Sequence, residues 1–301
     1  MTLKKFSILI PAVMLPLGIW LGYRVFRDHS LAGIVDSVAG IPFANLASAL
    51  ACAAASYVCL TGFDALAVRH VGRSLPYRKI ALTSFVSLSI GHNVGVAVLS
   101  SGALRYRLYS GFGFSALEVG EIILFCAVTV GLGLMSLGGL VLLLRPDLGL
   151  GMIGLTSAAV RGVGVLCLAL AGAYVLLAWR RRRPLSIRGH DFSVPDARIA
   201  MAQIAVGTAN FAFVAATLHQ LLAGSAEYTE TVAAYVLANA VGLVSPVPGG
   251  LGVLEYVISS LVAQGNVIAA LIVFRIVYFF VPLVLGSSLL AGTELFRSLS
   301  S

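Results

Sequence analysis

The chain has 301 residues, of which 59% are apolar and only 11% are charged, and its mean hydropathy is +0.99. Soluble domains carry about 25% charged residues, so a soluble enzyme, a nucleic-acid-binding domain and a disordered protein are excluded. The net charge of +8 fits basic residues gathered on cytoplasmic loops. The composition predicts an all-α, polytopic membrane bundle, because each spanning helix needs about 20 apolar residues.

Apolar stretches fill the chain, so we expect one transmembrane domain over residues 1–301, with halves of about 1–145 and 146–301. The first stretch, about Phe6–Phe26, has no A-x-A cleavage site and is interpreted as a retained helix. The tetrapeptide S-A-L-E at Ser115 predicts a capped helix start. Further helices are predicted over about Phe43–Val68, Leu117–Leu144, Leu150–Trp179, Ile199–Leu222 and Val267–Ala291.

Two further apolar segments, Ile80–Gly102 and Thr231–Val262, are interrupted by Ser, Gly or Pro. Basic residues mark cytoplasmic ends, and they lie at Lys4–Lys5, Arg69–Lys79, Arg180–Arg183 and Arg297. These basic residues and both chain termini can all lie on the cytoplasmic side only if each interrupted segment turns back within the membrane. The first segment would enter and leave on the cytoplasmic side, and the second would enter and leave on the outer side. Full crossing by either segment, against the charge rule, stays open.

The two interrupted segments also resemble each other. Leu88–Tyr106 and Leu237–Tyr256 both run Asn, then Val-Gly, then a turn of small residues or Pro, then Leu, a charge and Tyr. Entry from opposite sides would make them an inverted repeat, the usual build of a secondary transporter. A chance match between two Gly-rich turns is the alternative.

Ionisable side chains at membrane depth are costly and usually functional. The candidates are Asp64, Arg105, Arg107, Glu255 and Arg275. For Asp64 and Arg107 the alternative is snorkelling to the interface. His92 and Asn93 lie together in the first interrupted segment and are candidates for bonding a head group, the alternative being a satisfied polar pair.

The stretch Ser245–Glu255 combines two prolines with Gly249, Gly250 and a third glycine, which breaks a helix at membrane depth. Such a break is tolerated where the backbone is buried in protein or lines a wet cavity, and the free N–H groups of the half-helix that follows attract anions. We expect a second turn of this kind at Leu99–Arg105, which contains Ser101 and Gly102. Glycine turns that only let helices pack are the alternative.

Together these features predict a pocket for a zwitterionic lipid head group. Its phosphate would face Arg105, Arg275 and the two half-helix N-termini, and its ammonium would face Asp64 or Glu255. The cysteines and histidines show no metal-ligand spacing and no catalytic motif occurs, so we expect no metal site, no cofactor and no enzyme activity.

Four blocks resemble the membrane half of the multiple peptide resistance factor, the lysylphosphatidylglycerol synthase/flippase family: Phe63–Lys79, Gly91–Glu118, Ser245–Glu255 and Phe274–Leu283. The resemblance implies a lipid flippase of the bacterial inner membrane that moves aminoacylated phosphatidylglycerol to the outer leaflet and contributes to resistance against cationic antimicrobial peptides. It implies Asp64, Arg105, Glu255 and Arg275 as head-group or gating residues. The chain resembles the flippase module without the synthase half.

Two other functions remain open: a membrane subunit of a lipid-modifying transferase, and a permease for a small polar solute. The expected partners are a phospholipid substrate and, in either lipid reading, a separate synthase; nucleic acid is not expected. The sequence leaves open whether the chain forms homo-oligomers.

Overall fold

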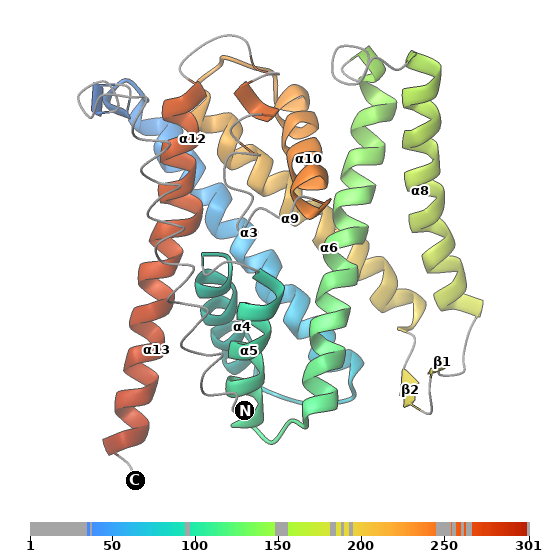
Figure 1. The fold of residues 1–301 in the computed structure, drawn as a ribbon, viewed down its shortest axis with the longest axis vertical. Coiled ribbons are helices and arrows are strands. Elements are labelled where there is room, and N and C mark those ends of the chain that lie inside the picture. Colours follow the sequence, from blue (N-terminus) through green and yellow to red (C-terminus); the bar gives the residue numbers. More distant parts are fainter. Residues whose placement is uncertain are drawn as a thin grey trace.

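The computed structural model describes residues 35–36, 38–93, 97–147, 156–180, 185–187, 190–192, 195–244, 254, 257–259, 262 and 267–299. The helix predicted over Phe6–Phe26 lies outside these residues. The described part is a helical bundle (Figure 1) in which five helical stretches are long and apolar enough to span a membrane. These are α3 (Phe43–His70), α6 (Ala116–Leu144), α8 (Ser157–Arg180), α9 (Ala197–Leu221) and the stretch Val267–Gly292. The prediction of a polytopic helical membrane bundle is confirmed.

Local signals set several helix ends. Pro42 precedes α3, where its missing N–H costs nothing. Ser115 and Glu118 form the predicted capping box of α6: the Ser115 hydroxyl accepts from the Glu118 N–H at 3.2 Å, and the Glu118 carboxylate accepts from the Ser115 N–H at 2.7 Å. Asp196 caps α9 by accepting from the Ile199 N–H at 2.8 Å.

Two short helices, α4 (Tyr77–Gly91) and α5 (Ala97–Ser110), lie side by side, and both reach the lower end of the bundle in Figure 1. At 1.5 Å per residue each is about 22 Å long, less than the roughly 30 Å hydrocarbon core. Both are shorter than a membrane-spanning helix, in keeping with the predicted hairpin, which we call the α4–α5 hairpin. α10 (Tyr228–Val244), the described part of the second interrupted segment, lies at the opposite, upper end; Ser245–Gly250 and Glu255 lie outside the described residues.

The turn of the first hairpin is not where the sequence suggested. The polypeptide leaves α4 at His92 and Asn93, whereas the small residues of Leu99–Arg105 are helical and belong to α5. They form a helix contact instead of a turn. A Cβ added at Gly91 would lie 2.6 Å from the Ser101 Cβ, and the Ser100 hydroxyl donates to the Gly91 carbonyl at 2.9 Å. Small residues at this position therefore let the two legs approach closely.

The last stretch combines α12 (Val267–Arg275), the π-helical turn η2 (Ile276–Phe280) and α13 (Val281–Leu299). The ends of α3, α8 and α13 that carry basic residues all point toward the lower side in Figure 1, the side on which α4 begins and α5 ends. This common placement is the one that the positive loops predicted. A small antiparallel hairpin, which the all-α prediction did not include, pairs β1 (Leu185–Ile187) with β2 (His190–Phe192) between α8 and α9.

The scaffold around the hairpin is closely packed. α6 and α9 cross at Gly133 and Gly207, where a Cβ on either glycine would collide with the other backbone. One turn away the fully buried Gln203 of α9 donates to the Thr129 hydroxyl of α6 at 2.9 Å and accepts from the Tyr174 hydroxyl of α8 at 2.6 Å. These contacts fix α6, α8 and α9 against one another.

Candidate functional site

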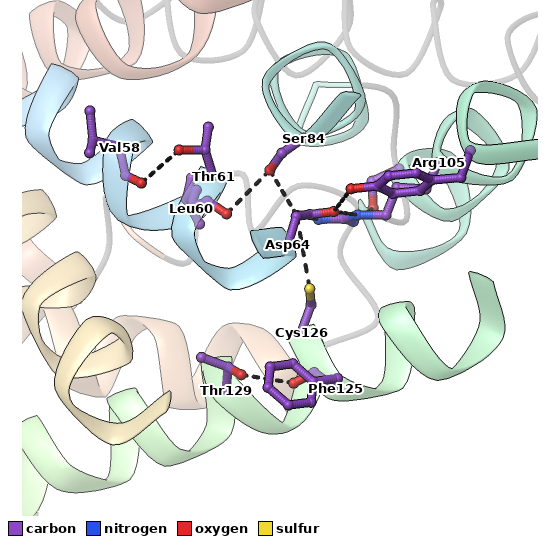
Figure 2. A network of polar contacts seen from close by, with 11 residues as sticks. Val58, Leu60, Thr61, Asp64, Ser84, Arg105, Phe125, Cys126 and Thr129 are labelled. Atoms are coloured by element: carbon purple, nitrogen blue, oxygen red, sulfur yellow. Dashed lines mark hydrogen bonds and ion pairs between the residues drawn. The ribbon is translucent and has the colours of Figure 1, made fainter. Parts of the chain in front are cut away.

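Asp64 of α3 and Arg105 of α5 form an ion pair inside the bundle (Figure 2). The Arg105 Nε donates to Asp64 Oδ1 at 2.9 Å, and a terminal guanidinium nitrogen donates to Oδ2 at 2.8 Å. Only 5% of the Arg105 side chain and 0% of the Asp64 side chain are exposed. This two-bond geometry is the strongest form of a carboxylate–guanidinium contact.

The carboxylate of Asp64 also receives neutral donors from the other helices around it. The Ser84 hydroxyl of α4 donates to Oδ2 at 2.7 Å, and the Tyr109 hydroxyl of α5 donates to Oδ1 at 3.1 Å. The Cys126 thiol of α6 lies 3.9 Å from Oδ2; Figure 2 shows it on the side of Asp64 away from Ser84. Asp64 therefore ties the α4–α5 hairpin to α3 and α6.

In this structure Arg105 and Asp64 contact each other, whereas the sequence predicted that they would contact opposite ends of a bound head group. Each neutralises the other, because two opposite charges in a poorly solvated interior are stable only when paired and fully hydrogen-bonded. The snorkelling alternative is wrong for Asp64, which is fully buried. Arg107, two residues from Arg105, is exposed, in keeping with an interfacial position.

Three other predicted residues meet at the tip of the hairpin. The Asn93 amide donates to the Ser89 carbonyl at 2.8 Å and to the Phe279 carbonyl of η2 at 3.3 Å. The His92 ring lies edge-on to the Phe279 ring, with 6.4 Å between centroids, and the Arg275 guanidinium lies 5.9 Å from the same ring's centroid. His92 Nδ1 is buried and has no hydrogen-bond partner among the described residues.

The remaining predicted site residues divide into two groups. Ser101 lies beside the ion pair, with its hydroxyl 3.4 Å from an Arg105 nitrogen, and Gly102 packs toward α6, where an added Cβ would lie 3.3 Å from Ile123. Gly249, Gly250 and Glu255 lie outside the described residues. The described site is thus the half built by the first hairpin.

A polar cluster in the middle of the bundle was not predicted. Ser56, halfway along α3, donates to the Asn210 side-chain oxygen of α9 at 2.8 Å, and its hydroxyl lies 2.8 Å from that of Tyr278 in η2. All three side chains are buried. Asn210 in the apolar sequence of α9 was the available signal, since a polar side chain at membrane depth needs a partner from another helix.

Exposed ion pairs lie at the two ends of the bundle. At the upper end Arg145 bonds Asp147 and reaches Glu227, just before α10, at 2.6 Å; the guanidinium holds the pKa of Asp147 below its usual value. Between α3 and α4 Arg73 bonds Glu118 at 2.6 Å. Such exposed pairs orient segments but stabilise little. Among the described residues, no three His, Cys, Asp or Glu side chains are grouped to hold a metal ion.

Comparison with known proteins adds the family. No family model matches the chain. It is 32% identical over 277 residues to the uncharacterized protein slr0712 of Synechocystis, covering 90% of this chain and 86% of that protein. The chain belongs to the same family as slr0712. It is also 28% identical over 270 residues to the inner membrane protein YbhN of Escherichia coli, covering 88% of this chain and 81% of YbhN.

The similarity to YbhN and the five spanning stretches identify this member of the slr0712 family as a multi-pass inner membrane protein. Neither relative is named as a flippase or as a multiple peptide resistance factor.

Proposed function

We propose that the protein is a flippase that moves a phospholipid of the phosphatidylglycerol or aminoacyl-phosphatidylglycerol type from the inner to the outer leaflet. The observation that carries this proposal is the α4–α5 hairpin, a pair of helices too short to span the bilayer, whose Arg105 forms a buried ion pair with Asp64 inside the bundle. Irregular backbone and charges at membrane depth are expensive and mark pathways for polar groups.

The polar character of the hairpin supports a transport role. Thr83, Ser84, Ser87 and Ser89 of α4 are all buried, and the Ser87 hydroxyl has no partner among the described residues. A helix that served only as an anchor would bury Leu or Ala here, since an unsatisfied buried hydroxyl costs about 1–3 kcal/mol. Hydroxyls that can rearrange suit a route through which a hydrated head group passes.

The charges fit the two ends of a zwitterionic head group. A guanidinium binds phosphate in the same two-bond geometry that it uses with a carboxylate, and a carboxylate binds ammonium. When the Asp64–Arg105 pair opens, Arg105 would take the lipid phosphate and Asp64 an aminoacyl ammonium. His92, Asn93 and Arg275 would receive the head group at the hairpin tip, with Glu255 and the glycines of the second hairpin completing the route.

The acyl chains would remain in the surrounding lipid while the head group crosses. A separate synthase would supply aminoacylated lipid on the cytoplasmic side, where we place both termini. Exposure of that lipid outside would then reduce the binding of cationic antimicrobial peptides, because its head group adds positive charge to the surface.

The test is lipid movement in proteoliposomes that contain the purified protein and fluorescent phosphatidylglycerol or lysylphosphatidylglycerol. Bleaching with dithionite from outside measures the fraction of probe that reaches the outer leaflet. We expect faster exchange than in protein-free vesicles, loss of that gain in the Asp64→Asn/Arg105→Met double variant, and an unchanged rate in Arg73→Gln, whose ion pair is exposed. Exchange no faster than in protein-free vesicles would refute the proposal. So would new lipid formed from charged tRNA, which would indicate a transferase.

A further inference from the structure

The helix that carries Arg275 is broken immediately after it. In η2 the Val281 N–H donates to the Ile276 carbonyl, one residue further back than in an α-helix. Pro282 follows and has no N–H, so it cannot supply the bond that the Tyr278 carbonyl would receive in a regular helix. The backbone of this turn is therefore incompletely bonded by the helix itself.

Side chains from two other elements donate to carbonyls of this turn. The Tyr57 hydroxyl of α3 donates to the Tyr278 carbonyl at 3.2 Å. The Asn93 amide at the hairpin tip donates to the Phe279 carbonyl at 3.3 Å. A turn whose carbonyls are bonded by side-chain donors can change its geometry by exchanging those donors. A continuous α-helix would have to break its own backbone hydrogen bonds to do the same.

The two halves joined by η2 pack against different parts of the protein. α12 is almost entirely buried and packs against α9. α13 packs against α4, where Gly286 lies so close that an added Cβ would collide with the Ser89 side chain. Because α4 is also in close contact with α5 through Gly91 and Ser101, α13 and the hairpin share tight backbone contacts.

We propose that η2 is a hinge about which α13 and the α4–α5 hairpin move as one unit, relative to a scaffold of α3, α6, α9 and α12. Tyr57 and Asn93 are positioning residues that hold the carbonyls of the hinge. The Asp64–Arg105 pair joins the moving hairpin to the scaffold, so opening the hinge requires this pair to separate. Hinges of transport proteins and enzymes are short segments of this kind that absorb backbone rotation.

The motion is measured directly with pairs of spin labels on lipid-facing positions, in a background whose native cysteines are replaced by alanine. One pair joins Leu140→Cys on α6 to Leu289→Cys on α13; the matched pair joins Leu140→Cys to Ile268→Cys on α12. All three side chains are exposed. In the Asp64→Asn/Arg105→Met double variant we expect the α6–α13 distance distribution to shift or broaden, while the α6–α12 distribution stays single.

Added to the double variant, Pro282→Ala restores an N–H for the Tyr278 carbonyl and should reverse the shift or broadening of the α6–α13 distribution. Made alone in the otherwise unmodified protein, Pro282→Ala should slow lipid exchange by about three- to tenfold, because one net hydrogen bond shifts an equilibrium by about that factor. Val281→Ala, which keeps the N–H bonded to Ile276, is the matched control and should change neither. Tyr57→Phe keeps the ring but removes its donor, and should broaden the distribution.

Equal shifts of both distances, or no shift of either, would overturn the hinge, as would a distribution that stays shifted or broadened when Pro282→Ala is added to the double variant. The inference rests on the proposed function only for the exchange rate. If the distances change as expected but the protein moves no lipid, the hinge stands and the flippase is refuted. If the protein moves lipid but the distances do not change, the flippase stands and the hinge is refuted.

Discussion

The buried ion pair makes a sharp prediction about stability. Arg105→Met removes two charge-assisted bonds and leaves the Asp64 carboxylate with neutral donors only, from Ser84, Tyr109 and Cys126. Asp64→Asn removes the countercharge and leaves the guanidinium with Ser101, whose hydroxyl is 3.4 Å away. Breaking one side of a buried pair costs about 3–5 kcal/mol, so each single variant should be strongly destabilised.

The double variant Asp64→Asn/Arg105→Met contains no buried charge and should recover most of that loss. The Asn side-chain oxygen can still accept from one of the two neighbouring hydroxyls, Ser84 or Tyr109, and its NH2 group can donate to the other. The two single effects should therefore exceed the double effect by about 3 kcal/mol or more, since contacting residues of one network are not additive.

The assay is a denaturation cycle on the four detergent-purified proteins, read by loss of helical signal and by the fraction that remains monodisperse. Arg73→Gln is the control, because its partner Glu118 is at the surface; it should unfold like the unmodified protein. Additive single effects, or single effects below about 1 kcal/mol, would show that Asp64 and Arg105 do not form the buried pair.

Three further predictions concern packing and pH. Gly91→Ala should destabilise by about 1–3 kcal/mol, because its Cβ would collide with α5, whereas Gly172→Ala, with open space around it, should not; thermal melts of the two variants compare them. Gln203→Leu should lower stability by about 1–3 kcal/mol, seen in the same melts, because it removes a hydrogen-bond partner of the buried Thr129 on α6 and of the half-buried Tyr174 on α8. Because Arg145 lowers the pKa of Asp147 in the folded protein, Asp147 contributes stability above its unfolded pKa, and this contribution is lost as the pH falls through the folded pKa. Arg145→Gln should therefore melt at a lower temperature than the unmodified protein at neutral pH, and the difference between the two melting temperatures should disappear in the acid range.

Much of the fold follows from the sequence because its signals are local. α3 begins at Phe43, directly after Pro42, where an apolar run begins. The capping box at Ser115 sets the start of α6 within one residue of the prediction. Charge balance predicted that the segment after Lys79 turns back instead of crossing, and two short helices, α4 and α5, occupy that position.

The misplaced turn shows where local signals fail. Ser101 and Gly102 have the composition of a break, but the same small side chains suit the face of α5 that meets α4 and α6. Sequence cannot distinguish the two uses, because the choice depends on what packs opposite. α4 instead ends at Gly91, and the chain turns at His92 and Asn93.

The partners within the site could not be predicted for a related reason. Asp64 and Arg105 are 41 residues apart, and Asn93 is 186 residues from the carbonyl that it bonds in η2. No periodicity connects positions on different helices. The sequence identified which residues are costly at membrane depth, and three-dimensional packing decided that two of them neutralise each other.

The most direct test of the central claim is mass spectrometry of the phospholipid that stays bound to the purified protein. If a polar head group is received at the first hairpin, one class of anionic or aminoacylated phospholipid should be enriched over the bulk membrane. That enrichment should disappear in the Asp64→Asn/Arg105→Met double variant and persist in Arg73→Gln. Bound lipid with the composition of the bulk membrane in all three proteins would contradict the account.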